Sequence, residues 1–250
     1  MKLQYLGDSR DAFKWDLLHW LCSRAAPHFS RLLFVPLLTR DDPKPTDGRT
    51  PHTRFRARPE IQAFVGSLRG HPDGLDAIRA LGRIDSATVF DVNVHSPRTF
   101  VPDGLDRTKY WSALEPSRFQ NTLVFLDPDN GFEIKSEKGG KWILDSEVAW
   151  LLCELPSSSA VVIYQHRPHR PWATVFEALT PRLQYAAYAS AAYNDFVAFV
   201  LLARDIGTAN RVRSAVGEYV KENPIVEYVA IKPSPNYALH RDARTSAARR

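Results

Sequence analysis

Short apolar runs alternate with amphipathic stretches along most of this chain, and this alternation limits its fold more than any other feature. The apolar runs are rich in β-branched residues and have the length of buried strands; they lie at residues 31–38, 87–92, 122–127 and 160–165. The amphipathic stretches have apolar residues at helical spacing; they lie at residues 9–24, 59–70, 73–82, 109–115, 145–153 and 170–179. Strands that alternate with helices predict βαβ units, and therefore a mainly parallel sheet with helices on both faces.

The order of elements changes toward the C-terminus. Residues 182–190 and 195–203 are apolar runs separated by a short turn, which leaves no room for a crossover helix and predicts an antiparallel hairpin. A helix over 208–222 and a strand over 226–231 are expected to complete the fold. The 250 residues are 44% hydrophobic, which is enough to bury a sizeable core. We predict one three-layer, Rossmann-like α/β domain over residues 1–232 and an extended basic tail over 233–250.

Composition narrows the class of protein further. An apolar run of about 18 residues, the length that spans a membrane, does not occur in the sequence, and the first residues lack a signal-peptide core. Cys22 and Cys153 both fall in apolar helical patterns, which predicts buried thiols and a cytoplasmic location. Two cysteines are too few for a zinc site built on cysteine.

The net charge of +5 is unevenly distributed, because the last ten residues alone carry a net +3. Within the domain, basic residues form two clusters. The first contains Arg49, His52, Arg54, Arg56 and Arg58, and the second contains His166, Arg167, His169 and Arg170. Such clusters are typical of the surface that meets a polyanion, although scattered surface arginine would give the same pattern.

Three of the expected strands lead directly into acidic or basic sequence. The first is followed by a long polar loop with Asp41, Asp42, Asp47, Gly48 and Arg49; the second by Asp127, Asp129, Asn130, Glu133 and Lys135; the third by Gln165, His166 and Arg167. The carboxyl ends of parallel strands share one edge of a sheet, where α/β proteins bind their ligands. Carboxylates gathered there repel one another unless a cation offsets them. The pattern predicts a Mg²⁺ or Mn²⁺ site made by Asp42, Asp127, Asp129 and Glu133.

Some of these residues also have plain structural interpretations. The sequence Asp127-Pro128-Asp129-Asn130-Gly131 is a good turn. Asp8 can cap the helix that begins at residue 9, and Asp11 suits its first turn. Lys14 shares the apolar face of that helix, where a lysine either extends to solvent or meets an acid or ligand. His166 can move a proton or hold a phosphate, or it can simply orient its loop.

The chain resembles an uncharacterised bacterial family in four motifs. They are Gly7-Asp8 with Asp11-Ala12-Phe13-Lys14-Trp15, then Asp47-Gly48-Arg49, then Asp127 through Ser136, and finally Tyr164-Gln165-His166. The likeness spans roughly residues 5–205, and it implies no activity.

Gly7, Asp11 and Lys14 also have the spacing of the opening motif of the methyltransferases that act on adenine in ribosomal RNA. Asp127-Pro128 resembles the start of the DPPY motif of that family, although Asp129 and Asn130 replace its last two residues. This resemblance implies a methyltransferase-like sheet with a terminal hairpin. It also implies S-adenosylmethionine as cofactor, with Gly7, Asp8, Asp11, Asp47 and Arg49 near it.

Three functions therefore stand as expectations. The first is a metal-dependent nuclease or phosphodiesterase on nucleic acid or a nucleotide, in which Lys14, Asp127, Lys135 and His166 act on the phosphodiester beside the metal. The alternative is a divergent nucleic-acid methyltransferase that uses S-adenosylmethionine. The third is a binding protein without catalysis on the same fold.

Overall fold

The computed structural model describes residues 1–25, 27–41, 51–95, 107–134 and 139–231. Seven strands form the central sheet, in the order β2-β1-β3-β6-β8-β7-β9. They are β1 (Arg31–Pro36), β2 (Asp91–Val94), β3 (Thr122–Asp127), β6 (Ala160–His166), β7 (Tyr188–Tyr193), β8 (Val197–Ala203) and β9 (Glu227–Ile231). The strands β2, β1, β3 and β6 are mutually parallel, while β8 runs antiparallel between β6 and β7. The predicted Rossmann-like α/β class, with its antiparallel hairpin near the C-terminus, is confirmed.

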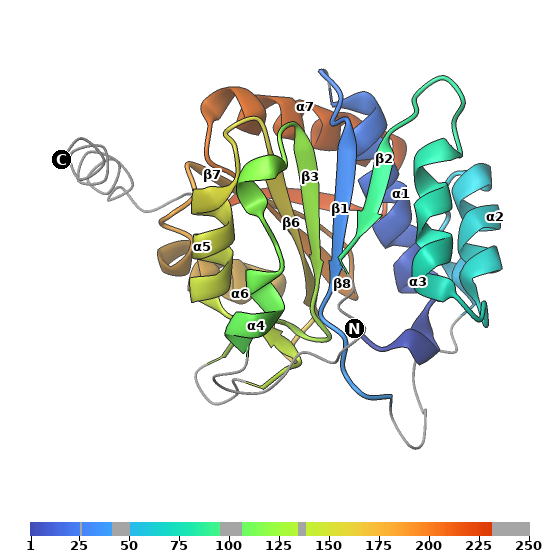
Figure 1. Ribbon diagram of the computed structural model, residues 1–250, viewed down its shortest axis with the longest axis horizontal. Helices are drawn as coiled ribbons and strands as arrows, with labels where there is room; N and C mark the ends of the chain where they lie inside the picture. The colour runs from blue at the N-terminus through green and yellow to red at the C-terminus, as the bar shows by residue number, and fades with distance from the viewer. Residues whose placement is uncertain (26, 42–50, 96–106, 135–138, 232–250) are drawn as a thin grey trace.

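Helices cover both faces of this sheet (Figure 1). The α-helices are α1 (Ser9–Arg24), α2 (Pro59–Leu68), α3 (Gly74–Ala77), α4 (Arg107–Ser112), α5 (Asp145–Glu154), α6 (Trp172–Leu179) and α7 (Ile206–Glu222). Short 3₁₀ turns occupy Leu3–Tyr5, His52–Arg54, Ile78–Arg83, Pro116–Arg118 and Thr180–Arg182. The core of one face includes α1, α2 and α7, and the core of the other includes α4, α5 and α6.

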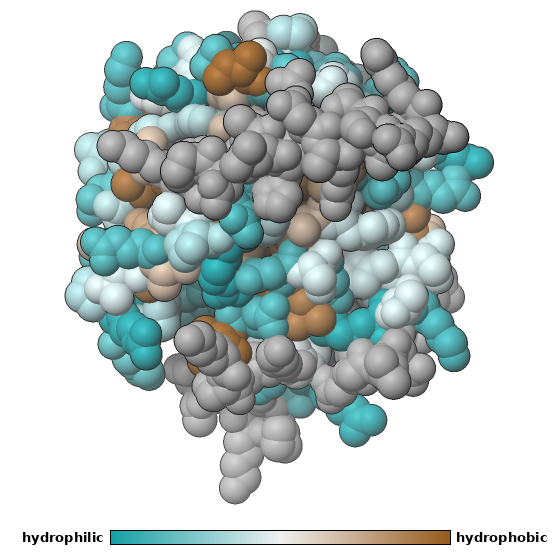
Figure 2. Space-filling view, turned by 90° about the vertical axis from the view of Figure 1, so that its left-hand side faces the viewer, coloured by the Kyte–Doolittle hydropathy of each residue, from teal (hydrophilic) through white to brown (hydrophobic). Residues whose placement is uncertain are grey.

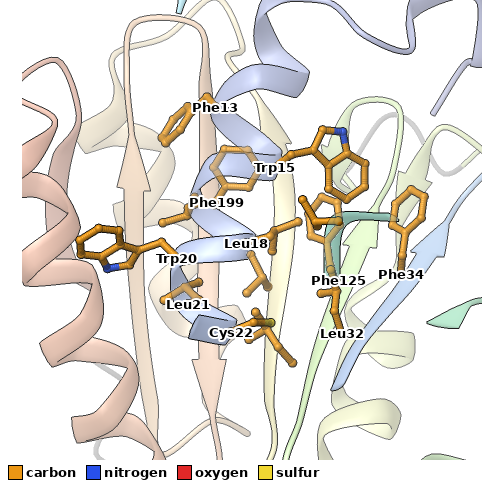
Figure 3. Packing of buried hydrophobic residues seen from close by; sticks show 14 of the residues in the cluster. Phe13, Trp15, Leu18, Trp20, Leu21, Cys22, Leu32, Phe34, Phe125 and Phe199 are labelled. Atoms are coloured by element: carbon orange, nitrogen blue, oxygen red, sulfur yellow. The ribbon is translucent and has the colours of Figure 1, made fainter. Parts of the chain in front are cut away.

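The first core is strongly aromatic because α1 lies along the sheet with every turn buried. Phe13 meets Phe199 of β8 edge-on, with ring centroids 4.9 Å apart, and Trp15 meets Phe34 of β1 at 5.2 Å. Figure 3 shows these rings between α1 and the strands beneath it. Aromatic pairs in such geometry add stability beyond their buried area. This packing fixes the start of α1 against the carboxyl ends of β3 and β6.

Two predicted strands are misplaced along the chain. The run 87–92 forms the second strand only at its end, because Val89 is 65% exposed and pairing with β1 begins at Asp91, opposite Arg31. The run 182–190 begins as a helical turn, in which the Leu183 amide donates to the Leu179 carbonyl, and β7 starts at Tyr188. Of the residues 191–194 between the two predicted strands, 191–193 thus belong to β7.

Smaller differences concern local geometry and exposure. Residues 73–82 form the short α3 and then a 3₁₀ turn instead of one helix. A second, two-stranded sheet, β4 (Gly131–Phe132) with β5 (Trp142–Ile143), was not predicted. Cys22 is a buried thiol as expected, but Cys153 is only half-buried.

Nothing in the described part of the chain is a helix both long and apolar enough to cross a membrane. On the face shown in Figure 2, hydrophobic residues are scattered among hydrophilic ones.

Candidate functional site

A pocket of about 250 Å³ opens at the carboxyl ends of β3 and β6, next to the start of α1. We call it the α1 pocket. Its walls come from the N-terminal residues and the first turns of α1, from the loop 127–130 after β3, from the end of β6, and from Lys141. In Figure 1 this edge of the sheet is the lower one, where the N-terminus also lies. The volume lies just below the range of about 300–1,000 Å³ typical of small-molecule sites.

Strand alternation explains which side chains face the α1 pocket. Leu123 and Phe125 of β3 belong to the core beneath α1, so Asp127, two residues further, points to the same face. In β6, Val162 belongs to that core, and Tyr164 and His166 follow it at the same spacing. The parallel pairing of β3 with β6 brings these strand ends together, as the sequence predicted.

Lys14 forms the floor of the α1 pocket. Its Nζ lies 2.6 Å from Asp11 Oδ1 and 2.8 Å from Asp127 Oδ2, and the side chain is almost fully buried. The ammonium also lies 5.4 Å from the centre of the Tyr164 ring. Burial alone would lower the pKa of Lys14, but the two carboxylates outweigh it and hold this pKa above its ordinary value. Lys14 is therefore a permanent cation that neutralises part of the acidic cluster.

Asp11 and Asp8 organise the start of α1. The second carboxylate oxygen of Asp11 accepts a hydrogen bond from the Gly7 amide at 2.7 Å, so both of its oxygens are occupied. Asp8 is the N-cap, and its Oδ1 accepts from the amides of Arg10 and Asp11. Burial, and then the charge of Asp11, raise the pKa of Asp8 to about 6. The capping roles predicted for these two acids are confirmed, and both also line the α1 pocket.

Only one of the two carboxylate oxygens of Asp127 accepts a hydrogen bond from the described residues. Its side chain is 2% exposed, and Lys14 donates to Oδ2, but Oδ1 has no hydrogen-bond partner among the residues that the structure describes. Burial raises the pKa of Asp127, against the opposing effect of Lys14. The Tyr164 hydroxyl likewise makes no hydrogen bond within the described ranges, and both residues line the α1 pocket. A ligand there meets a carboxylate acceptor and a phenol whose hydrogen-bonding capacity is unused.

The loop after β3 is held in place by Gln165, which lies on the opposite side of β6 from Tyr164. Its Oε1 accepts from the Phe132 amide at 2.9 Å, and its Nε2 donates to the Asn130 carbonyl at 3.2 Å. Gly131 has φ +118°, and a Cβ there would lie 2.3 Å from Gln165 Oε1. Only glycine fits this position, so the turn interpretation of residues 127–131 is confirmed in part.

The predicted metal ligands are only partly brought together. Asp127 and Asp129 both line the α1 pocket; Asp129 Oδ2 lies 3.5 Å from Lys2 Nζ and accepts from the Thr39 hydroxyl at 3.3 Å. Glu133 does not line it, because its Oε1 accepts from the Asp145 amide at the start of α5. In the ranges that the structure describes, nowhere do three histidine, cysteine, aspartate or glutamate side chains come close enough to hold a metal ion.

His166 reaches the α1 pocket, where it is half-buried, and its Nδ1 lies 3.2 Å from the Arg167 carbonyl oxygen. Asp42, Asp47, Arg49 and Lys135 lie outside the described residues, so their predicted roles stay predictions.

Sequence reasoning missed several residues of the α1 pocket. Tyr164 belongs to the Tyr164-Gln165-His166 motif, and its place two residues before His166 puts it on the same face of β6. Arg10 and Lys141 also line the pocket, and no pattern marked either of them. Lys141 follows β4 by a connection whose course the hydrophobic pattern did not predict.

No protein-family model and no curated protein matches this chain. Among solved structures, the chain is similar to protein LPL1258 from Legionella pneumophila str. Philadelphia 1, whose family model is DUF519. The two are 10% identical, the match covers 92% of this chain and 98% of that chain, and the TM-score is 0.47. A likeness at this level says nothing about activity.

Proposed function

We propose that this protein is a divergent methyltransferase that uses S-adenosylmethionine and acts on an amino group of a nucleic-acid base. The observation that carries the proposal is the carboxylate of Asp127. Its Oδ2 accepts a hydrogen bond from Lys14, while its Oδ1 is open to the α1 pocket. The site lies where Rossmann-like sheets bind their ligands, at the carboxyl ends of the parallel strands.

The residues present suit both a cationic cofactor and an amine substrate. Four acids line the α1 pocket together with Lys2, Arg10, Lys14 and Lys141, and Lys14 pairs with Asp11 and Asp127. An open carboxylate oxygen attracts a positively charged group or an N–H donor, and S-adenosylmethionine supplies a methyl group activated by a sulfonium cation. The fit therefore rests on the open Asp127 Oδ1.

In the proposed reaction each residue has a definite task. Asp127 Oδ1 accepts a hydrogen bond from the N–H of the amine, which orients the nitrogen and increases its electron density. Methyl transfer would break the bond to the sulfonium sulfur, which would leave as a neutral thioether, and the nitrogen would lose a proton that Asp127, whose pKa burial raises, can take. Lys14 keeps Asp127 in place and ionised beforehand. Tyr164 offers a hydroxyl donor on the same wall.

The metal-dependent phosphodiesterase is the second candidate, because Asp127 and Asp129 both line the α1 pocket. It ranks lower because the cation that offsets the acids is already part of the chain, with Lys14 Nζ 2.8 Å from Asp127 Oδ2. A metal ion at Asp127 has to compete with this ammonium. Glu133, expected as a further ligand, caps α5 instead.

Calorimetric titration separates the candidates. S-adenosylmethionine is added to EDTA-treated protein, and Mn²⁺ is then added to the same sample. Micromolar binding of the cofactor supports the methyltransferase. Heat of binding with Mn²⁺ alone favours the phosphodiesterase. If neither titration gives heat of binding, a binding protein without catalysis is favoured.

The role of Asp127 is tested by transfer of labelled methyl groups to mixed RNA and DNA. Asp127→Asn is expected to reduce transfer by about 100-fold or more while cofactor binding changes little. Glu115→Gln, an exposed acid at the opposite edge of the sheet, is the matched control. Transfer by Asp127→Asn at the wild-type rate contradicts the proposed mechanism.

A further inference from the structure

A second, smaller hollow adjoins the α1 pocket. Its volume is about 160 Å³, and Ser9 and Arg10 of α1, Arg54, Phe196 and Ile225 are among the residues that line it. We call it the Phe196 hollow. Arg10 lines both sites, so the two meet at the first turn of α1. Phe196 and Ile225 are 48% and 56% exposed, an unusual position for large apolar side chains.

The backbone fixes Phe196 in this exposed position. The Phe196 amide donates to Asn194 Oδ1 at 2.9 Å, and its carbonyl accepts from the Arg167 amide at 3.0 Å. The Asn194 carbonyl is itself held by the Trp172 indole at 2.7 Å. With both backbone groups satisfied and the turn anchored to α6, the backbone that carries the ring is held in place. A ligand that stacks on the ring therefore has little backbone entropy to remove.

The two basic clusters found in the sequence meet at this ring. The Arg54 guanidinium lies over one face of the Phe196 ring, 5.1 Å from its centre, so a stacked base has to use the other face. Arg167 follows β6 directly, and its amide donates to the Phe196 carbonyl. Arg167 lies 3.9 Å from the carboxylate of Asp195, so the one acid of this turn has a cation beside it. Arg58 does not contribute, because its Nε donates to the buried Asp16 at 2.7 Å.

We infer that the Phe196 hollow binds single-stranded nucleic acid, with one base stacked on Phe196 and the neighbouring phosphates near Arg10 and Arg54. Every base has a π-face that stacks on an exposed aromatic ring, and arginines beside the ring attract the backbone, which is how sequence-tolerant single-strand sites are built. An acidic peptide would use the same cations, but it reaches the ring only where it carries an aromatic or apolar side chain, whereas every nucleotide brings a base. The inference deepens the proposed function and rests on it for the choice of nucleic acid as substrate.

The test is fluorescence anisotropy of a labelled single-stranded oligonucleotide of mixed sequence, as RNA and as DNA. Phe196→Ala is expected to bind about 5-fold to 150-fold more weakly than the wild type, the range measured when one stacking ring is removed. Phe196→Tyr is expected to keep the affinity. Val89→Ala removes an apolar side chain that is even more exposed than Phe196, just before β2 at the opposite edge of the sheet, and is expected to leave the oligonucleotide affinity unchanged.

Arginine variants test the electrostatic part separately. Arg54→Ala is expected to reduce the slope of log affinity against log salt by about one, whereas Arg118→Ala, an exposed arginine at the opposite edge of the sheet, leaves it unchanged. Polyglutamate is added as a competitor. If it displaces the oligonucleotide and Phe196→Ala binds as the wild type does, the surface is a general polyanion site and the inference is wrong. Absence of oligonucleotide binding by the wild type also refutes it.

Failure of this inference and failure of the proposed function give different results. Phe196 does not line the α1 pocket, so Phe196→Ala is expected to bind S-adenosylmethionine as the wild type does. If Phe196→Ala loses oligonucleotide affinity and the wild type does not bind S-adenosylmethionine, the nucleic-acid site is supported and only the methyltransferase proposal is refuted.

Discussion

Removal of the Lys14 charge is the change that the structure predicts most sharply. Lys14→Met leaves Asp11 and Asp127 buried without their ammonium, whose Nζ lies 2.6 and 2.8 Å from their carboxylates. At an effective dielectric constant of about 20, unit charges at these separations attract by roughly 6 kcal/mol per pair. Burial of each ion costs several kcal/mol, and the balance when one partner is lost is a destabilisation of about 3–5 kcal/mol.

Urea unfolding followed by tryptophan fluorescence measures this loss at pH 7.5. For a chain of this size it corresponds to a Tm lower by roughly 6–20 °C. Lys221→Met, an exposed lysine in the last turn of α7, is the matched control and is expected to change stability by less than about 0.5 kcal/mol.

The same variant has a predicted pH dependence. Burial already raises the pKa of Asp127, and loss of Lys14 raises it further. A carboxyl whose folded-state pKa exceeds its unfolded value favours the folded state at low pH, and this contribution is lost as pH rises through the folded value. The difference in the free energy of unfolding between Lys14→Met and the wild type is therefore largest at high pH and decreases as pH falls. Adding Asp127→Asn to Lys14→Met is expected to recover part of the stability, and a deficit that is small, or independent of pH, refutes the buried ion pair.

Three further changes test the surroundings of the site. Gly131→Ala is expected to cost about 1–3 kcal/mol from backbone strain alone, because of φ +118° and the contact with Gln165, and urea unfolding measures it. Glu133→Ala is expected to lower the free energy of unfolding by about 0.5–2 kcal/mol, because its carboxylate accepts from the Asp145 amide at the start of α5; an unchanged urea midpoint contradicts that placement. Asp8→Asn keeps a capping oxygen and removes a charge whose pKa is about 6, so it is expected to exceed wild-type stability at pH 7.5 and to lose this advantage below about pH 4.

The sequence predicted the central strands well because their signal is local. Residues 122–127 form β3 as expected, and the runs at 31–38 and 160–165 match β1 and β6 to within two residues, since a continuous apolar run bounded by turns has few alternatives. Residues 87–92 and 182–190 were misplaced because their boundaries depend on tertiary pairing. Asp91 becomes the start of β2 only because Arg31 lies opposite.

The candidate site was predicted in its parts but not in its connections. Lys14 was placed on the apolar face of its helix and Asp127 at a strand end, yet their ion pair joins residues 113 apart and leaves no periodic trace. The sequence therefore suggested a metal ion to offset the acids, where the structure supplies a lysine. Glu133 was grouped with those acids because the small sheet of β4 and β5, which turns it toward α5, consists of two-residue strands.

The position of Arg10 couples the binding of two ligands to this protein. Its side chain lines both the α1 pocket and the Phe196 hollow. A ligand that draws the guanidinium toward one of these sites changes the charge that the other presents. The two occupancies are then coupled, and thermodynamic linkage requires the effect to be reciprocal: whatever factor the first ligand imposes on the affinity of the second, the second imposes on the first.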